Sequence, residues 1–335
     1  MKKNEKFTIV DIAEMLNVSK STVSRAFRDS HDVHPETRDR ILKLARELDF
    51  EPNTIAKSLK EKKTKTIGAL IPGFSMPFYA TAICGIQEQV TKNGYNLMVC
   101  QSNEIYADEV NCLKALVSSK VDGIIMSVSS ETVRNNHIVQ LIEKGIPVVL
   151  FNRTTNLNIS AVKVDDYGGA YMMTEHLISR GYKKIFYIAG PLNLLLTQQR
   201  LSGFKDAMYV NKRQVTDNMI VPSTFTFESG RESIARILSG GEKPDAIFCV
   251  CDIVAFGVIQ YLKEHGHKIP EDIAVAGYTD EPSASLIHPS LTTIRQPIKE
   301  IGIQAAELLF RQLKYVNYKP VVITMPVQIM IREST

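Results

Sequence analysis

Residues 17–27 read NVSKSTVSRAF, and this short stretch decides how the beginning of the chain folds. Six of its side chains are hydroxyls or cations, grouped around a few small apolar positions. Val23, Ala26 and Phe27 have the spacing of one buried helix face. A helix that only packs into a core has no need for so many polar groups, whereas a helix that contacts phosphates and base edges does. The stretch therefore predicts an exposed helix suited to a polyanion.

Two further helical patterns flank this stretch. Residues 8–16, TIVDIAEML, place four apolar side chains on one stripe, and Thr8 is available as the N-cap. Residues 34–50, HPETRDRILKLARELDF, form a longer pattern with Pro35 in its first turn. Asn17 tolerates the positive φ that a sharp turn between the first two helices requires. The three patterns together predict a helix-turn-helix over residues 1–50.

The second helix of a helix-turn-helix lies in the major groove of DNA with its N-terminal side chains leading. The residues expected to read base edges are Lys20, Ser21 and Arg25, and those expected to hold phosphates are Ser19, Thr22 and Ser24. Arginine is well suited to the O6 and N7 atoms of guanine. From these residues alone, a small helical bundle with a merely hydrated polar face remains the alternative.

The charge of the chain is unevenly distributed. The 335 residues carry a net charge of +4, and the whole excess of cations falls within residues 1–65. Such an asymmetry predicts a polyanion-binding segment attached to a neutral body. A chain of this length suits two or three domains.

A charged segment, EPNTIAKSLKEKKTKT, follows at residues 51–66. Ala56 and Leu59 are three positions apart and share one helix face, with Lys57 and Lys60 beside it. One interpretation is a linker without regular structure. The other is a marginal helix that orders only on DNA, with Leu59 inserted into a minor-groove step.

From Thr66 onward the pattern alternates between short apolar runs and amphipathic helical stretches. Nearly continuous apolar runs are typical of parallel strands that are covered on both faces. This alternation predicts a doubly wound α/β body over residues 66–335, and its eight or more strands require two sheets. The helical stretches are expected at 80–93, 107–119, 168–180, 200–210, 228–238, 253–265 and 298–314.

Three irregular segments indicate where the chain crosses between two lobes: residues 152–160, 288–297 and 318–334. The expected first lobe covers about 66–160 plus 293–320, and the second covers about 161–292 plus 321–335. A chain that crosses three times forms two lobes around a ligand cleft at the carboxyl ends of the strands.

Several side chains are expected at these strand ends. Phe78 and Tyr79 follow PGFSMP and suit a stacking platform, although packing within a helix explains them equally well. Asn152 and Arg153 follow an apolar strand and can hydrogen-bond a hydroxylated or anionic ligand. Arg200 is expected to open a helix, where the dipole disfavours a cation, so a ligand or a carboxylate partner is required to explain it.

Two more candidates come from the loops that follow strands. Asp252 stands directly after CVC, at an expected N-cap, and capping is a sufficient role for it. Phe225 lies in the loop after MIVPSTF and can cover a ligand ring.

The segments at 8–27, 33–53 and 55–59, the last reading IAKSL, closely resemble the headpiece and hinge of the lac repressor (LacI/GalR) family of transcription regulators. The resemblance implies that Lys20, Ser21 and Arg25 read bases. It further implies that Asn53, Ala56 and Leu59 belong to the hinge. Asn17 departs from the glycine that the family usually has there. The full set expected to contact DNA is Thr8, Ser19, Lys20, Ser21, Thr22, Ser24, Arg25, Asn53, Ala56 and Leu59.

The body likewise resembles periplasmic sugar-binding proteins, which implies an effector pocket between its lobes. Thr279 stands where many family members have an acidic residue, and Asp280 follows it. Leu194 and Leu196 replace polar contacts found in some members, which indicates a partly apolar subsite. The full set expected to contact an effector is Phe78, Tyr79, Asn152, Arg153, Arg200, Phe225, Asp252, Thr279 and Asp280.

The sequence therefore predicts a DNA-binding transcription regulator, most simply a repressor. A homodimer is expected to present two headpieces to a palindromic operator, and a sugar-like effector to control its affinity. The alternative is an α/β enzyme fused to a DNA-binding headpiece. No G-x-x-x-x-G-K-[ST], G-x-G-x-x-G or G-x-S-x-G motif occurs in the required setting, so no catalytic activity is expected.

No cofactor and no metal site are expected either. The five cysteines are scattered among apolar residues without the spacing of a zinc site. No apolar run approaches the roughly 18 residues of a membrane span, and the basic start lacks the apolar core of a signal peptide. A cytoplasmic protein without membrane contact is the expectation.

Overall fold

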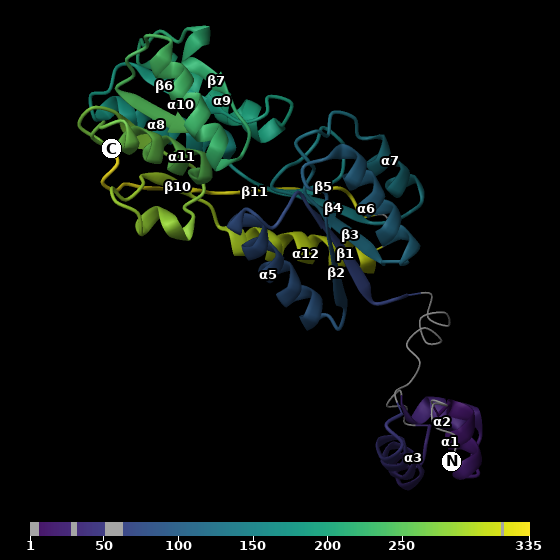
Figure 1. Ribbon diagram of the computed structural model, residues 1–335. Helices are drawn as coiled ribbons and strands as arrows, with labels where there is room; N and C mark the ends of the chain where they lie inside the picture. Colours follow the sequence, from purple (N-terminus) through teal and green to yellow (C-terminus); the bar gives the residue numbers. More distant parts are fainter. Residues whose placement is uncertain (1–6, 28–31, 51–62, 316–317) are drawn as a thin grey trace. The chain divides into compact units, whose positions relative to one another are not determined.

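A computed structural model of the chain describes residues 7–27, 32–50, 63–315 and 318–335 (Figure 1). The chain divides into two compact units, the first ending at Thr64 and the second beginning at Lys65. Among the described residues, no helix is long and apolar enough to cross a membrane.

The first unit contains three helices: α1 (Ile9–Met15), α2 (Lys20–Ala26) and α3 (Pro35–Glu47). Thr8 begins α1 with a capping box, because its side chain accepts from the backbone of Asp11 while the Asp11 carboxylate accepts from the backbone of Thr8. Asn17 adopts a φ of 52° in the turn that follows, as its side chain allows. The core of this unit consists of Ile12, Ala13, Val23, Ala26, Val33, Ile41 and Ala45.

The first lobe of the second unit is built on a six-stranded sheet with the order β11-β5-β4-β3-β1-β2. All of its strand pairs are parallel. Its strands are β1 (Thr66–Ile71), β2 (Asn96–Gln101), β3 (Gly123–Met126), β4 (Val148–Phe151), β5 (Ser160–Val164) and β11 (Val322–Met325). Its helices are α5 (Pro77–Lys92), α6 (Tyr106–Ser118), α7 (Asn136–Glu143) and α12 (Ile298–Lys314). Helices α5 and α12 pack on one apolar cluster, and α6 and α7 on another.

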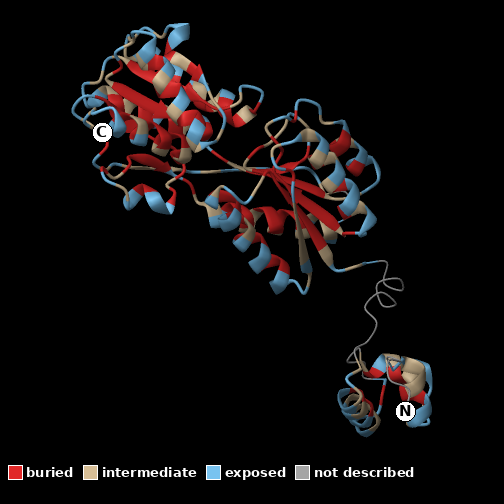
Figure 2. Ribbon diagram, viewed as in Figure 1, coloured by how far each residue is buried: buried red, intermediate tan, exposed pale blue. Residues whose placement is uncertain are grey.

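The second lobe is built on a four-stranded parallel sheet with the order β7-β6-β8-β9. Its strands are β6 (Ile185–Ala189), β7 (Ile220–Pro222), β8 (Ala246–Cys249) and β9 (Ala274–Ala276). Its helices are α8 (Asp166–Ser179), α9 (Leu195–Val210), α10 (Phe227–Ser239) and α11 (Asp252–Glu264), with short 3₁₀ turns at Asp217–Met219 and Pro282–Ser285. In Figure 2 the central strands of both sheets are buried, as their apolar sequences predict, whereas the edge strands β2 and β11 of the first lobe are partly exposed.

The positions of three strands correct the expected lobe boundaries. Strand β5 pairs with β4 and so extends the first lobe past residue 160 to Val164. Strand β11, which was expected in the second lobe, pairs with β5 in the first. Strand β10 (Thr293–Arg295), which was expected in the first lobe, pairs with β12 (Gln328–Met330), and both pack on the core of the second. Apolar strand sequences fit either sheet, and only the hydrogen-bonded neighbour decides between them.

Glycines allow three pairs of helices to pack closely. A Cβ atom at Gly302 of α12 would lie 2.1 Å from the carbonyl oxygen of Ala82 in α5. One at Gly257 of α11 would lie 2.0 Å from the carbonyl oxygen of Phe227, at the start of α10. One at Gly203 of α9 would lie similarly close to the α8 backbone. One of these pairs belongs to the first lobe and two belong to the second.

Candidate functional site

Helix α2 presents polar residues at the surface of the first unit. Lys20, Ser21 and Arg25 are exposed, whereas Val23 and Ala26 are buried against the other two helices. The 3.6-residue period of the helix separates these two sets of side chains. The three residues expected to read base edges therefore share one accessible helix.

Two of the hydroxyl groups have a local structural role as helix caps. The Ser19 Oγ accepts from the backbone N–H of Thr22 at 3.1 Å, and it lies 2.7 Å from the Oγ of Ser21. Thr8 caps α1, and its hydroxyl donates to the Asp11 carboxylate at 2.8 Å. Both caps are exposed to solvent, although each hydroxyl already has three partners within its own helix terminus.

Of the remaining residues predicted to contact DNA, one lies on α2 and three lie outside the described part of the chain. Ser24 is half-buried on α2. The Nε of Arg38 donates to the Ala26 carbonyl at 3.3 Å, which holds α3 against the end of α2. Asn53, Ala56 and Leu59 lie outside the described residues, so their expected hinge contacts remain a prediction.

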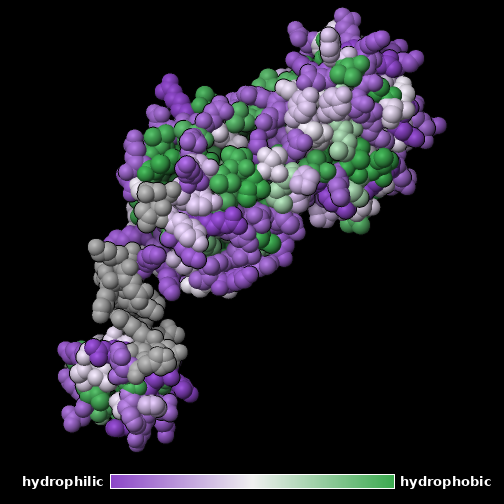
Figure 3. Space-filling model, turned by 180° about the vertical axis from the view of Figure 1, so that it is seen from behind, coloured by the Kyte–Doolittle hydropathy of each residue, from purple (hydrophilic) through white to green (hydrophobic). Residues whose placement is uncertain are grey.

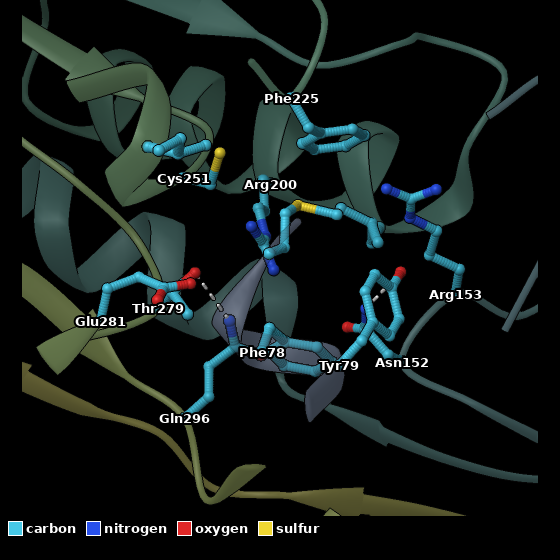
Figure 4. Close-up of a pocket in the computed structure, with 13 residues that line it drawn as sticks. Phe78, Tyr79, Asn152, Arg153, Arg200, Phe225, Cys251, Thr279, Glu281 and Gln296 are labelled. Atoms are coloured by element: carbon cyan, nitrogen blue, oxygen red, sulfur yellow. Dashed lines mark hydrogen bonds between the residues drawn. The ribbon is translucent and has the colours of Figure 1, made fainter. Parts of the chain in front are cut away.

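A pocket lies between the two lobes of the second unit (Figure 4). The space between its lining side chains, including the solvent at its open side, amounts to about 430 Å³. Seven residues predicted from the sequence line it: Phe78, Tyr79, Asn152, Arg153, Arg200, Phe225 and Thr279. Leu196, which was expected in a partly apolar subsite, lines it too. Five further lining residues were not predicted: Met76, Cys251, Ile253, Glu281 and Gln296. The topology thus brings together strand ends that lie more than 200 residues apart in the sequence.

Arg153 is buried at one side of the pocket with its charge already balanced. Its Nη1 and Nη2 donate to the two carboxylate oxygens of Glu104 at 2.6 and 2.9 Å, and Nη1 also contacts the carbonyl of Val128. The guanidinium carbon lies 4.5 Å from the centroid of the Phe225 ring. Burial raises the pKa of Glu104, but the charge and hydrogen bonds of Arg153 outweigh it, and the pKa lies below its usual value.

Arg200 has a carboxylate partner as well, which decides between the two explanations that the sequence left open. Its Nε and Nη2 both lie 2.8 Å from Oδ1 of Asp166, and its Nη1 donates to the Val250 carbonyl at 2.6 Å. Its guanidinium also lies 3.6 Å from the centroid of the Tyr278 ring. The expectation that Arg200 opens a helix is wrong, because α9 begins at Leu195 and places it in the second turn.

The aromatic residues at the start of α5 serve packing and pocket lining together. The rings of Phe78 and Tyr79 meet edge to face, with centroids 5.2 Å apart, and both side chains are almost fully buried. The Tyr79 hydroxyl lies 3.2 Å from the Ser127 Oγ and accepts from the Asn152 Nδ2 at 3.4 Å. Asn152 reaches this position with a φ of 58°.

Asp252 and Asp280 were expected to contact an effector, but neither is among the residues that line the pocket. Asp252 is fully buried and accepts from the Thr293 hydroxyl at 2.5 Å and the Glu281 backbone at 2.8 Å. Burial is the largest cause that raises its pKa to about 6. It is the first residue of α11, while Cys251 occupies the N-cap where Asp252 was expected.

Asp280 connects two segments of the second lobe. One carboxylate oxygen accepts from the Nε of Arg295 at 2.6 Å and the other from Nη2 of Arg332 at 2.5 Å. The carboxylates of both aspartates are thus engaged by groups from distant segments of the chain. Their hydrogen bonds are made there rather than in the pocket.

Glu281 and Gln296 are the polar lining residues that sequence reasoning missed. Glu281 follows Thr279 in the loop after β9, and its place near a strand end was the available signal. Burial, and then the charge of Asp252, raise the pKa of Glu281 to about 7, against an interaction with the Phe78 backbone. Gln296 comes from the loop after β10, where no sequence pattern marks it.

Comparison with known proteins agrees with this architecture. Residues 8–53 match the family described as bacterial regulatory proteins, lacI family, and residues 174–335 match a periplasmic binding protein-like domain. Over 333 residues the chain is 33% identical to catabolite control protein A of Priestia megaterium, covering 98% of this chain and 99% of that protein. The chain belongs to the lacI family.

Another lacI-family relative is the ribose operon repressor of Haemophilus influenzae, 32% identical over 98% of both chains. Among solved structures, the transcriptional regulator CelR–cellobiose complex aligns with a TM-score of 0.76 and 26% identity, covering 98% of this chain and 100% of that chain. The predicted fold class, a helix-turn-helix followed by a two-lobed periplasmic-binding-protein-like α/β body, is confirmed.

Membership of the lacI family also decides the class of function. The chain is a DNA-binding transcriptional regulator with an effector-binding domain, and its relatives carry the names of regulators and repressors rather than of enzymes. The prediction that the chain is not an enzyme is confirmed by these relatives.

Proposed function

We propose that this chain is a homodimeric repressor that acts in the cytoplasm on a palindromic operator. A small carbohydrate-like effector, bound between the two lobes, changes its affinity for that operator. The observation that carries the proposal is that one chain combines an exposed polar helix, α2, with an aromatic-lined pocket between two lobes.

Helix α2 supports sequence-specific DNA recognition. Arg25 and Lys20 are exposed on it, and arginine donates bidentately to guanine in the major groove. The hydroxyls of Ser19 and Ser21 lie at its N-terminus, where phosphates are favourably bound. In this proposal the cations read bases and the hydroxyls fix the register on the backbone.

The pocket supports a sugar-like effector. Phe78 and Phe225 offer aromatic faces, and Asn152, Thr279 and Gln296 offer hydrogen-bonding groups for hydroxyls. One relative is named for the ribose operon, and one similar structure is described as a cellobiose complex. Both names favour a carbohydrate for this chain.

Allosteric control in this proposal depends on contacts that cross between the lobes. The Asn193 side chain, before α9, donates to the Ser130 carbonyl, after β3, at 2.6 Å. The Phe225 ring of the second lobe stacks on the Arg153 guanidinium of the first. A ligand held by both lobes favours one arrangement of these contacts. It can then change operator affinity only by its differential affinity for the two states.

The surface of the second unit supports dimerisation through the body. Large apolar side chains remain exposed there, among them Tyr209, Val210, Leu286 and Ile331. Figure 3 shows apolar patches on one face of this unit among mainly hydrophilic residues. Exposed apolar patches are typical of association surfaces.

The experiment that tests the proposal begins with selection of duplexes from a random library by the full-length chain. Fluorescence anisotropy then measures operator affinity with and without sugars, and light scattering measures the mass of the complex. We expect a palindromic site, two chains per duplex, and an affinity that falls steeply between about 50 and 200 mM salt. An affinity that is equal for selected and random duplexes, or that no sugar changes, contradicts the proposal.

A further inference from the structure

The cations that line the pocket are already paired. Arg153 is neutralised by Glu104 and Arg200 by Asp166, and each also donates to a backbone carbonyl. Among the described residues that line the pocket, these two are the only lysine or arginine side chains. An anionic ligand is bound tightly when it meets a cation or several N–H donors without other partners. The lining therefore offers an anion no uncompensated charge.

The opposite side of the pocket carries negative charge instead. Glu281 lines it, and among the described residues no lysine or arginine forms an ion pair with that carboxylate. The buried Asp252, whose carboxylate accepts from the Glu281 backbone N–H at 2.8 Å, carries the same sign and raises the pKa of Glu281. An ionised Glu281 is an acceptor only, and its one opposing group is the backbone N–H of Phe78.

Gln296 adds a second acceptor on the same side. Its side chain is 6% exposed, its Nε2 donates to the Thr279 hydroxyl at 3.4 Å, and its Oε1 has no hydrogen-bond partner among the described residues. Figure 4 shows Glu281, Thr279 and Gln296 together, across the pocket from Arg153. Buried carbonyl oxygens nearly always have a partner, so this one is left for a ligand.

We infer that the pocket selects an uncharged ring that directs adjacent hydroxyl or N–H donors at Glu281 and Gln296, and that it rejects phosphate esters and carboxylates. The inference rests on the proposed function, since it specifies the effector of the same site. Met76, Leu196 and Ile253 supply apolar surface for the face of the ring. An anion would instead lie near the Glu281 carboxylate, which repels it.

The test uses the full-length chain at about pH 7.5, where Glu281 is mostly ionised. Calorimetry and thermal shift compare matched compounds: D-ribose with ribose 5-phosphate, and D-glucose with glucose 6-phosphate and gluconate. Cellobiose and hypoxanthine are added, because a free sugar and a nucleobase both present donors on an uncharged ring. We expect a neutral compound to bind, and its anionic counterpart to bind at least about a hundredfold more weakly.

Two variants locate the contact. Glu281→Gln removes the charge and Gln296→Leu removes the free acceptor, and each should weaken the neutral ligand at least about tenfold. Glu232→Gln, an exposed change on α10, should not alter ligand affinity. The melting temperature of each variant without ligand shows that it is folded.

The outcomes separate the inference from the function on which it rests. An anionic compound that binds as tightly as its neutral counterpart overturns the inference and leaves the proposed function standing. A neutral ligand that binds both pocket variants within about twofold of the unmodified chain does the same. If no compound binds or changes operator affinity, the inference and the proposed effector control fail together.

Discussion

Arg153 and Glu104 form a two-point ion pair, with Nη1–Oε2 and Nη2–Oε1 distances of 2.6 and 2.9 Å. Arg153 follows β4, and Glu104 lies between β2 and α6 with a φ of 65°. The pair joins two strand-end loops beside the pocket. Arg153, which the sequence suggested as a ligand contact, therefore has a structural role in the folded chain.

Replacing Glu104 with glutamine should destabilise the second unit. The change leaves a buried guanidinium without a counter-charge, which costs on the order of 2–4 kcal/mol. Urea unfolding followed by circular dichroism measures it. The control is Glu88→Gln, which breaks an exposed pair with Lys299 and should cost less than about 1 kcal/mol. Equal effects of the two changes would contradict the structural role of the Arg153 pair.

The buried pair of Arg200 and Asp166 should show strong coupling. Arg200→Met alone leaves a buried carboxylate unpaired and should cost about 3–5 kcal/mol in the free energy of unfolding. Asp166→Leu in the same chain should recover much of that loss, because no buried charge then remains unpaired. A double variant that is only as stable as the sum of the single losses would show that the two side chains act independently.

Gly257→Ala should separate helices α10 and α11. The added Cβ would lie 2.0 Å from the Phe227 carbonyl oxygen, a backbone atom that can move only with its helix. Overpacking of this kind costs about 1–3 kcal/mol. Thermal unfolding measures the loss. Gly73→Ala is the matched control, since its Cβ would meet only a side-chain atom at 3.7 Å, and its melting temperature should be nearly unchanged.

Glu281 should make stability depend on pH near neutrality. Its pKa is about 7 in the folded chain and near 4.5 when unfolded, so ionisation disfavours the folded state. The stabilisation of the folded state by protonated Glu281 is fully present below pH 4.5 and is lost as the pH rises to about 7. Over this pH window, we expect the free energy of unfolding of the unmodified chain to fall by on the order of 2 kcal/mol relative to that of Glu281→Gln.

Denaturant unfolding of both chains at several pH values measures that difference. Asp252, whose pKa is about 6, also makes the free energy of unfolding fall as pH rises, and it does so in both chains. Parallel stability curves for the two chains would show that Glu281 does not titrate in this range.

Arg25→Ala should reduce discrimination between the selected operator and random DNA. Losing a bidentate contact to guanine costs about 1–3 kcal/mol at one base pair while leaving the contacts to phosphates intact. Competition binding against mutated operators measures the specificity at each position. Arg236→Ala, on helix α10 of the second unit, is the control. An unaltered preference at every base pair would show that Arg25 does not read bases.

Local pattern predicted most of the helices and strands and much of the pocket lining, but β10, β11 and β12 lie in segments that were expected to be irregular. The stripe of Ile12 and Ala13 and the turn at Asn17 depend on neighbours within a few residues, so the sequence specifies them directly. Phe78, Asn152 and Phe225 could be placed at the pocket because parallel strands end at a common edge.

The sequence by itself determined where most helices and strands form, because those choices depend on short-range periodicity. The DNA-binding role of residues 8–53 came from their resemblance to the lacI family, and the family match confirms it. Only the tertiary structure decided the partners of charged groups. Arg153 meets Glu104 and Arg200 meets Asp166 across 49 and 34 residues, and Gln296 is left with a free acceptor. Charge pairing depends on distance through space and on burial, and both are set only once the sheets, the crossings and the close helix pairs are in place.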